Sequence, residues 1–365
     1  MTSLAHCSGY KLSMNQSPHN SWLHRFAVLT ALATLALLGI GGLVTSHGAG
    51  MAVPDWPTSY GYNMFALPFH FWKGGVFYEH SHRLVASGVG MLTMILAVWL
   101  WFSETRRWMR WLGVIALVAV VLQGVLGGLR VVWFKDQIGI IHATLAQLFF
   151  ALVCAIALFT SRWWVERRPP ARLNGGLGQA GSETGAPLRW LFLATTILIF
   201  LQLIIAATMR HEHAGLAISD FPLAHDKLWP DMSDAAVERY NQQRMEVVSL
   251  KPITAFQIGL QMAHRIVAVM ILIGVAACVW RGARTQLKKL TFTWLGLILV
   301  QIALGAWTIW SNKAADVATA HVLVGAFSLV TGVLGCIICN ARLAGNKTPH
   351  VVGDSQCSTI RTVSV

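Results

Sequence analysis

Residues 84–103 read LVASGVGMLTMILAVWLWFS, a run of twenty residues without a charge. A helix of this length rises about 30 Å, which is the thickness of the hydrocarbon core of a membrane. Further apolar runs of similar length occupy residues 26–45, 108–129, 139–160, 188–208, 264–280, 291–310 and 318–340. The sequence therefore predicts an all-α membrane protein with eight transmembrane helices.

The composition agrees with this prediction, because 55% of the residues are hydrophobic and only 12% are charged. Such a balance excludes an ordinary soluble domain. The formal net charge is +13, which raises the question of a nucleic-acid partner. The basic residues form short clusters between the apolar runs and no continuous patch. We therefore predict the lipid bilayer as the partner, and no nucleic acid.

The basic clusters also predict how the chain is oriented. Arg106, Arg107, Lys288 and Lys289 fall in connections that, by the positive-inside rule, face the cytoplasm. Both termini then lie in the cytoplasm, and the loops after the first and fifth helices face outward. The expected location is the inner (plasma) membrane of a cell, crossed several times. No cysteine falls in an outward loop, so we expect no structural disulfide there.

The chain contains an internal repeat. The segment Gly50-Met-Ala-Val-Pro-Asp-Trp-Pro57 matches Gly215-Leu-Ala-Ile-Ser-Asp-Phe-Pro222, and Glu79-His-Ser-His-Arg83 matches Gln261-Met-Ala-His-Arg265. Four crossings return a chain to its starting side, so both copies have the same orientation. The repeat predicts two pseudo-symmetric four-helix bundles.

The repeat also divides the chain into segments. An Arg-, Pro- and Gly-rich stretch between the copies predicts a flexible cytoplasmic linker without a fold. The outward loop of the second copy is longer than that of the first and is expected to form an ordered or partly ordered cap. The predicted segments are a cytoplasmic tail (1–23), an N-terminal bundle (24–161), the linker (162–187), a C-terminal bundle (188–342) with the long loop (210–260), and a cytoplasmic tail (343–365).

Each copy places two histidines near the outer ends of its even-numbered helices. Ionisable groups inside a membrane are costly and usually functional. Two imidazoles that face each other across a bundle suit a haem with two histidine ligands. Each histidine is followed four residues later by alanine or glycine, which leaves room for a flat macrocycle. The proposed iron ligands are His82 and His142 in the first copy, and His264 and His321 in the second.

Other interpretations of these residues stay open. A histidine at a helix end is often only a hydrogen-bonded interfacial group, and zinc would need further ligands that the pairs lack. His80 lies on a different helical face from His82 and is its rival as a ligand. Cys336 and Cys339 form a CxxC, for which packing of small residues in a membrane helix is the favoured explanation over a redox or metal pair.

The two copies differ at one chemically important position. Glu79 precedes His82 by three residues and shares its face, whereas the equivalent residue in the second copy is Gln261. A partly buried glutamate beside a haem can take or deliver protons. The alternative is a structural ion pair with Arg83. The asymmetry predicts a reacting haem in the first half and an electron-relaying haem in the second.

Two further sets of residues each admit two roles. Arg83 and Arg265 follow the proposed ligands and are candidates to neutralise haem propionates, or to anchor the helices at the interface. The Asp55-Trp-Pro and Asp220-Phe-Pro turns are expected to fold back over each bundle, with the aromatic ring packed beneath. The two aspartates either cap these turns or bind a ligand.

From residue 24 to 342, these motifs closely resemble those of the heme A synthase family, since the Pro-Asp-Trp-Pro loop, the Glu-x-x-His-Arg motif and all four histidines occur in order. The resemblance implies oxidation of the C8 methyl group of heme O to a formyl group, by two hydroxylations and loss of water, which supplies heme A to terminal oxidases. It implies that His82 and His142 hold heme O, that Glu79 assists the oxidation, and that His264 and His321 ligate a permanent heme b.

The implied partners are an electron donor and, further, heme O synthase and assembly factors of the terminal oxidase. This sequence lacks the outward cysteine pair of some members, which puts any thiol-dependent step in doubt. A di-heme electron-transfer cytochrome b is the main alternative, but such proteins often carry two ligands 13–14 residues apart on one helix, where this chain has Ile95 and Leu96 after His82. A non-catalytic haem carrier would not need Glu79.

Overall fold

The computed structural model describes residues 20–166, 182–247 and 252–345. Within this part the chain forms helices and no strand, and eight helices are long and apolar enough to cross a membrane. The prediction of an all-α membrane protein is confirmed. The spanning helices are α1 (Ser21–Ser46), α2 (Gly75–Ser103), α3 (Arg107–Trp133), α4 (Asp136–Thr160), α6 (Ser182–His211), α8 (Ala255–Gly282), α9 (Lys288–Trp310) and α10 (Ala315–Gly345).

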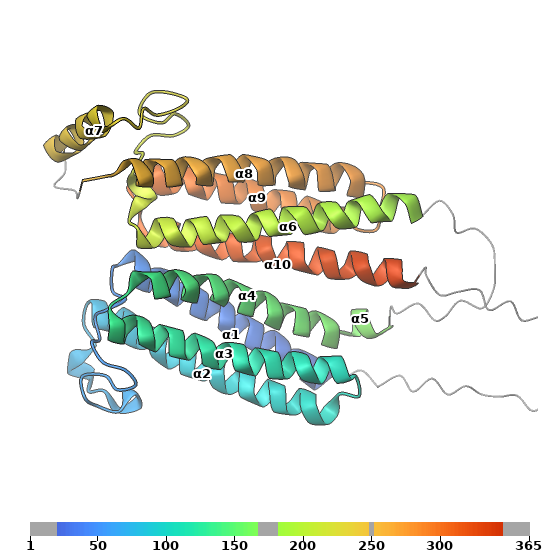
Figure 1. Cartoon of the computed structure of the whole chain (residues 1–365). Helices are drawn as coiled ribbons and strands as arrows, with labels where there is room; N and C mark the ends of the chain where they lie inside the picture. Colours follow the sequence, from blue (N-terminus) through green and yellow to red (C-terminus); the bar gives the residue numbers. More distant parts are fainter. Residues whose placement is uncertain (1–19, 167–181, 248–251, 346–365) are drawn as a thin grey trace, which may run out of the picture.

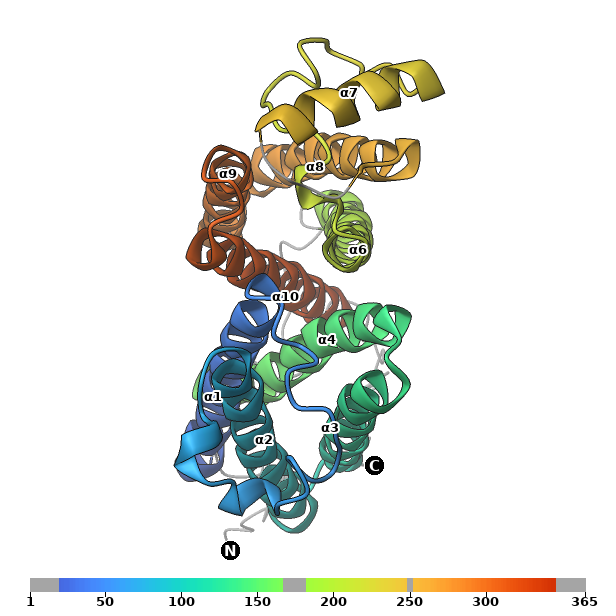
Figure 2. The ribbon, with the colours of Figure 1, turned by 90° about the vertical axis from the view of Figure 1, so that its left-hand side faces the viewer.

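The spanning helices form two groups of four, which lie side by side (Figures 1 and 2). In the first group α1 packs on α2 and α4, and α3 packs on α2 and α4; α6, α8, α9 and α10 form the same closed ring in the second group. Each ring has its own apolar core. Leu100 and Met109 are fully buried in the first, and the ring of Phe192 stacks on that of Trp294, 5.1 Å away, in the second. This arrangement is compatible with the predicted pseudo-symmetry.

The two groups meet along α10, which packs against α1 and α4, while α4 also packs against α6. Phe150, Ala151, Ala326 and Val330 form a buried cluster at this contact. The ring of Phe150 lies edge-on to that of Phe327, with their centroids 6.1 Å apart. The helices that carry His142 and His321 are therefore in direct contact.

Helices α2 and α8 begin nine residues before the starts predicted from hydropathy, 84 and 264. Gly74, with φ of 54°, ends the preceding loop, and Thr254 and Gln257 form a capping box at the start of α8. The polar residues of these first turns interrupt the apolar pattern but not the helix, because they pack beneath the loops. His82 consequently lies about two turns inside α2 rather than at its end.

Two connections contain more structure than predicted. The linker assigned to 162–187 includes the short helix α5 (Arg162–Glu166) and the start of α6, so the expected lack of fold does not hold there; residues 167–181 lie outside the described residues. The long loop contains η3 (Ala214–Leu216) and α7 (Asp234–Val247). Residues Ala217, Ile218, Ile258 and Met262 form a small core to which Val237 and Tyr240 of α7 contribute. The described part of this loop forms an ordered cap. Helix α7 was missed because so few of its side chains are apolar.

Candidate functional site

The loop between α1 and α2 is folded around the carboxylate of Asp55. Its oxygens accept hydrogen bonds from the backbone N–H of Tyr60 (2.7 Å) and Gly61 (2.9 Å) and from the Thr58 hydroxyl. Burial raises the pKa of Asp55, but these donors together outweigh it, so the pKa of this carboxyl lies below its ordinary value of 3.8. Asp55 therefore caps the turn.

The loop between α6 and α8 repeats this geometry at the equivalent positions. Asp220 accepts from the backbone N–H of His225 (2.8 Å) and Asp226 (3.1 Å), which again lie five and six residues further along. Burial raises the pKa of Asp220 and the hydrogen bonds lower it, with a net depression below 3.8. Of the two roles predicted for Asp55 and Asp220, the structure shows the capping role in both copies.

An arginine fastens each loop to the helix beneath it. The Arg83 guanidinium donates to the carbonyls of Asp55 (2.7 Å), Thr58 (3.0 Å) and Val53 (3.0 Å). In the second half, Arg265 donates to the carbonyls of Asp220 (2.7 Å) and Leu223 (2.8 Å). Both arginines also line the cavity described below. Their pairing with haem propionates stays a prediction.

Glu79 and Gln261 occupy equivalent places and contact equivalent backbone. Glu79 is 4% exposed; its Oε2 accepts from the N–H of Val53 at 2.9 Å and its Oε1 pairs with Arg83 at 2.8 Å. Gln261 is 3% exposed, accepts from the N–H of Ile218 at 2.7 Å and donates to the Ile218 carbonyl. The structure contains the ion pair considered above. It also places Glu79 among the residues that line the cavity.

All four predicted histidines line one cavity of about 1570 Å³ that extends through both helix groups. The small residues four positions after them, Ala86, Ala146, Ala268 and Gly325, line it as well. Trp56 and Phe221 with the prolines that follow them lie at its loop end, as predicted for the two turns. His80 does not line the cavity. Its ring is fully buried and lies edge-on to Trp72, which favours His82 as the ligand.

Glycines on neighbouring helices make room for the imidazoles. A Cβ atom on Gly41 of α1 would lie 3.0 Å from Cε1 of His82, and one on Gly127 of α3 would lie 3.4 Å from Cε1 of His142. A Cβ atom on Gly305 of α9 would likewise lie 3.2 Å from Cε1 of His321. Gly127 and Gly305 are equivalent in the repeat. A Cβ at Gly41 or Gly305 would require the imidazole to shift by a few tenths of an ångström, and a larger side chain at any of the three positions would crowd it further.

Glutamines on the third helix of each group orient the fourth-helix histidines. The amide of Gln301 lies 3.3 Å from Nε2 of His321. In the equivalent place Gln123, in the amide orientation that satisfies both of its ends, donates to Nδ1 of His142 at 2.9 Å. Such contacts set which ring nitrogen is free to bind a metal. In the sequence, these glutamines stand out only as equivalent positions of the two copies.

The second pair has the spacing of two ligands to one metal atom. The ring centroids of His264 and His321 are 6.4 Å apart. Two imidazoles bound from opposite sides, with metal–nitrogen distances of about 2.0 Å, would place their centroids about 6 Å apart. Nδ1 atoms of His82, His264 and His321 are buried without a hydrogen-bond partner in the described part of the chain. The spacing of His264 and His321 therefore fits a bis-histidine haem.

Zinc fits less well. No group of three or more His, Cys, Asp or Glu side chains lies together among the described residues, whereas structural zinc takes four ligands and catalytic zinc three. Cys336 lies in α10, with its sulfur 3.7 Å from the hydroxyl of Thr196. It belongs to helix packing, as favoured from the sequence.

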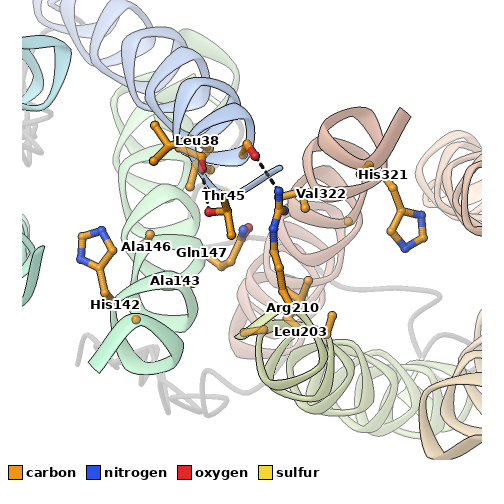
Figure 3. Close-up of a pocket in the computed structure, with 18 of the residues that line it drawn as sticks. Leu38, Thr45, His142, Ala143, Ala146, Gln147, Leu203, Arg210, His321 and Val322 are labelled. Carbon is orange, nitrogen blue, oxygen red and sulfur yellow. Dashed lines mark hydrogen bonds between the residues drawn. The ribbon is translucent and has the colours of Figure 1, made fainter. Parts of the chain in front are cut away.

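Three cations that line the cavity were missed by sequence reasoning: Arg130, Arg210 and Lys313. Arg210, at the end of α6, donates to the Ser46 hydroxyl (2.6 Å) and the Gly42 carbonyl of α1. Figure 3 shows it between the helices that carry His142 and His321. Burial and the nearby Arg210 lower the pKa of Lys313. In the sequence, Arg210 follows an apolar run, as interfacial anchor residues often do. Nothing in the sequence distinguishes a cavity-lining arginine from such an anchor.

Sequence comparison agrees with this geometry. The family described as cytochrome oxidase assembly protein, COX15-CtaA, matches residues 24–333. This chain belongs to that family, the heme A synthases. Heme A synthase of Geobacillus kaustophilus is 27% identical over 353 residues, covering 92% of this chain and 98% of the relative. Heme A synthase of Lysinibacillus sphaericus is 25% identical, with 87% and 94% covered.

A third relative, heme A synthase of Shouchella clausii, is 30% identical over 222 residues, or 59% of this chain and 68% of its own length. The family match covers both loops, Glu79 and all four histidines. Membership assigns the chain a role in heme A synthesis as a membrane oxidoreductase, and so disfavours the separate electron-transfer cytochrome and the carrier.

Proposed function

We propose that the protein oxidises the C8 methyl group of heme O to the formyl group of heme A, by two successive hydroxylations followed by loss of water. The observation that carries this proposal is the asymmetry between the two histidine pairs. Both pairs line the same cavity, but only the first has a carboxylate, Glu79, in the place that Gln261 takes in the second. Proton transfer is needed where the methyl group reacts and not where electrons are relayed.

In this proposal, His82 and His142 hold the substrate heme O, and His264 and His321 hold heme b. When bound, heme b supplies one-electron transfer toward the substrate. Glu79, held by the Val53 N–H and Arg83, accepts or delivers protons at the substrate side of the cavity. Arg83 and Arg265 are in reach of the cavity and are proposed to pair with propionates while they fasten the loops.

The proposal extends to the surroundings of the site. The histidine pairs lie toward the end of the molecule that carries the long loops, opposite the ends of α1 and α10 that lead to the termini (Figure 1). With both termini in the cytoplasm, the haem sites lie near the outer face of the plasma membrane. The proposed partners are an electron donor, heme O synthase as the source of substrate, and assembly factors of the terminal oxidase.

The test is to express the chain in cells supplied with heme O, extract the non-covalent haems, and identify them by chromatography and mass. Heme A is expected beside heme b. A chain that retains heme b and unmodified heme O, without heme A, would refute the proposal and leave an electron-transfer role.

A further inference from the structure

The cavity reaches deeper along the first helix group than along the second. Its lining in the first half includes Met91 and Met94 of α2 and Leu117 and Val121 of α3. Aligned through Glu79 with Gln261 and through Gln123 with Gln301, the equivalent residues are Ile273, Ala276, Leu295 and Leu299. None of these four lines the cavity.

Glycines account for the extra depth. The first half has Gly88 and Gly90 on α2 and Gly124 on α3, and all three line the cavity. A Cβ atom on any of them would meet no other atom within 4 Å, so open space lies over each. The equivalent residues in the second half are Met270, Leu272 and Ile302. The same position is therefore open in one copy and filled in the other.

This space is a groove that is closed at the end away from the histidines and open on one side. Toward the opposite end of the helices, α2 and α3 approach closely, because a Cβ on Gly113 would lie 3.2 Å from the Cα of Ala97. Nearer the histidines, the side chains of Met91 (57% exposed), Met94 (49%) and Val121 (58%) reach the molecular surface that lipid would cover. We call Gly88, Gly90, Met91, Met94, Leu117, Val121 and Gly124 the α2–α3 groove.

The groove is continuous with the first histidine pair. His82 lies on α2 six residues before Gly88, and both line the same cavity. Its Nδ1 is buried and has no hydrogen-bond partner among the described residues, as expected for a side chain that awaits a ligand. All seven groove residues are apolar, and two are methionines, whose unbranched side chains adapt to irregular apolar ligands. The ligand of this site thus has a polar, metal-binding part and an apolar extension.

We propose that the α2–α3 groove binds the isoprenoid tail of the substrate heme O. The inference rests on the function proposed above, and it explains why only the first half has the groove, since heme b in the second half has no such tail. The groove selects for tailed haem at His82 and His142. Its open side lets the tail extend between α2 and α3 toward the lipid.

The test fills the groove with the residues of the second half. Gly124→Ile and the triple variant G88M/G90L/G124I are purified as full-length protein, and binding of heme O and of protohaem, which has no tail, is followed by absorbance titration. We expect heme O affinity to fall at least tenfold, while protohaem affinity changes less than twofold. Gly296→Ile is the matched control: this glycine of α9 is also exposed, with nothing within 4 Å of its Cβ, and should alter neither affinity.

Retention of haem at His264 and His321 verifies that each variant is folded. If the triple variant does not fold, the single variant Gly124→Ile still tests the groove. Equal loss of both ligands, or unchanged preference for heme O, overturns the groove assignment and leaves a cleft occupied by membrane lipid. The two proposals fail separately. If the unmodified protein binds heme O with this preference but yields no heme A, the oxidation is refuted and the groove stands.

Discussion

At the scale of single residues, the proposed chemistry rests on the residue that stands three positions before the first histidine of each copy. Glu79 and Gln261 both accept a hydrogen bond from loop backbone, of Val53 and Ile218 respectively. The structural task of this position is therefore done by either residue. What the glutamate adds is a group that can exchange a proton.

We accordingly expect Glu79→Gln to keep both haems bound and to lower heme A formation by about 10²- to 10⁴-fold, the usual contribution of a general acid or base. The matched control is Gln261→Glu, which should leave formation unchanged. The measurement is heme A per mole of protein, with total haem determined in the same extract. Normal heme A output from Glu79→Gln would remove this residue from the mechanism.

The sequence was sufficient to select candidate residues that the structure brings to one cavity, and insufficient to give their contacts. Four histidines at repeat-equivalent positions stand out because ionisable groups in apolar helices are rare. Arg210 does not stand out, because its role depends on α6 lying beside Ser46 of α1, and such packing between the halves has no local sequence pattern. The same holds for Gly41, whose importance follows only from the ring of His82 beside it.

At the scale of helices and loops, close approach between neighbours positions the ligands. We expect Gly305→Val to displace the imidazole of His321, since even a Cβ at this position would lie 3.2 Å from the ring. The heme b bound per protein should fall severalfold. Gly296→Val on the same helix has open space and should keep its haem. Full haem content in Gly305→Val would show that His321 is not held at this place.

The loop turns should respond to acid. The pKa of Asp55 is depressed in the folded loop, so the ionised carboxylate stabilises the turn fully above the ordinary value of 3.8, and this stabilisation is lost as the pH falls through the folded value. Proteolysis of the loop at residues 54–62 should therefore increase below about pH 4. Asp55→Asn should be cut faster at neutral pH and should respond less to acid. Equal cleavage of both proteins at every pH would contradict this role.

The boundaries of these elements show where hydropathy is a poor guide. The sequence contains eight apolar runs that predict transmembrane helices, and all eight lie in helices. It does not predict that α2 already includes Glu79 and Arg83. Charged residues lower the mean hydropathy of a stretch of sequence even when their side chains are hydrogen-bonded to loop atoms, as that of Arg83 is. Helix α7 was missed for the opposite reason, since it is polar and is held by only a few buried side chains.

At the scale of the whole molecule, each histidine pair is complete within its own four-helix group. The groups are joined by packing of α10 on α1 and α4, and by Arg210. We therefore expect residues 1–174 and 175–365, expressed as two chains in one cell, to copurify and to bind haem in both halves. Arg210→Ala, which removes the bonds to Ser46 and Gly42, should weaken this association. Separate chains that never copurify would show that the covalent connection is required.

The hydrogen bonds from Arg83 and Arg265 to the two outward loops bear on how a ligand reaches the cavity. Each outward loop is held to the helix below it by arginine hydrogen bonds to loop carbonyls, whereas on the lipid-facing flank of α2 and α3 the cavity residues Met91, Met94 and Val121 are exposed. On the groove assignment proposed above, the tailed haem enters and leaves sideways, within the plane of the bilayer. On the same proposal, we expect the protein that delivers heme O and the protein that collects the product to be embedded in the membrane beside this chain, so that transfer occurs within the bilayer rather than through water.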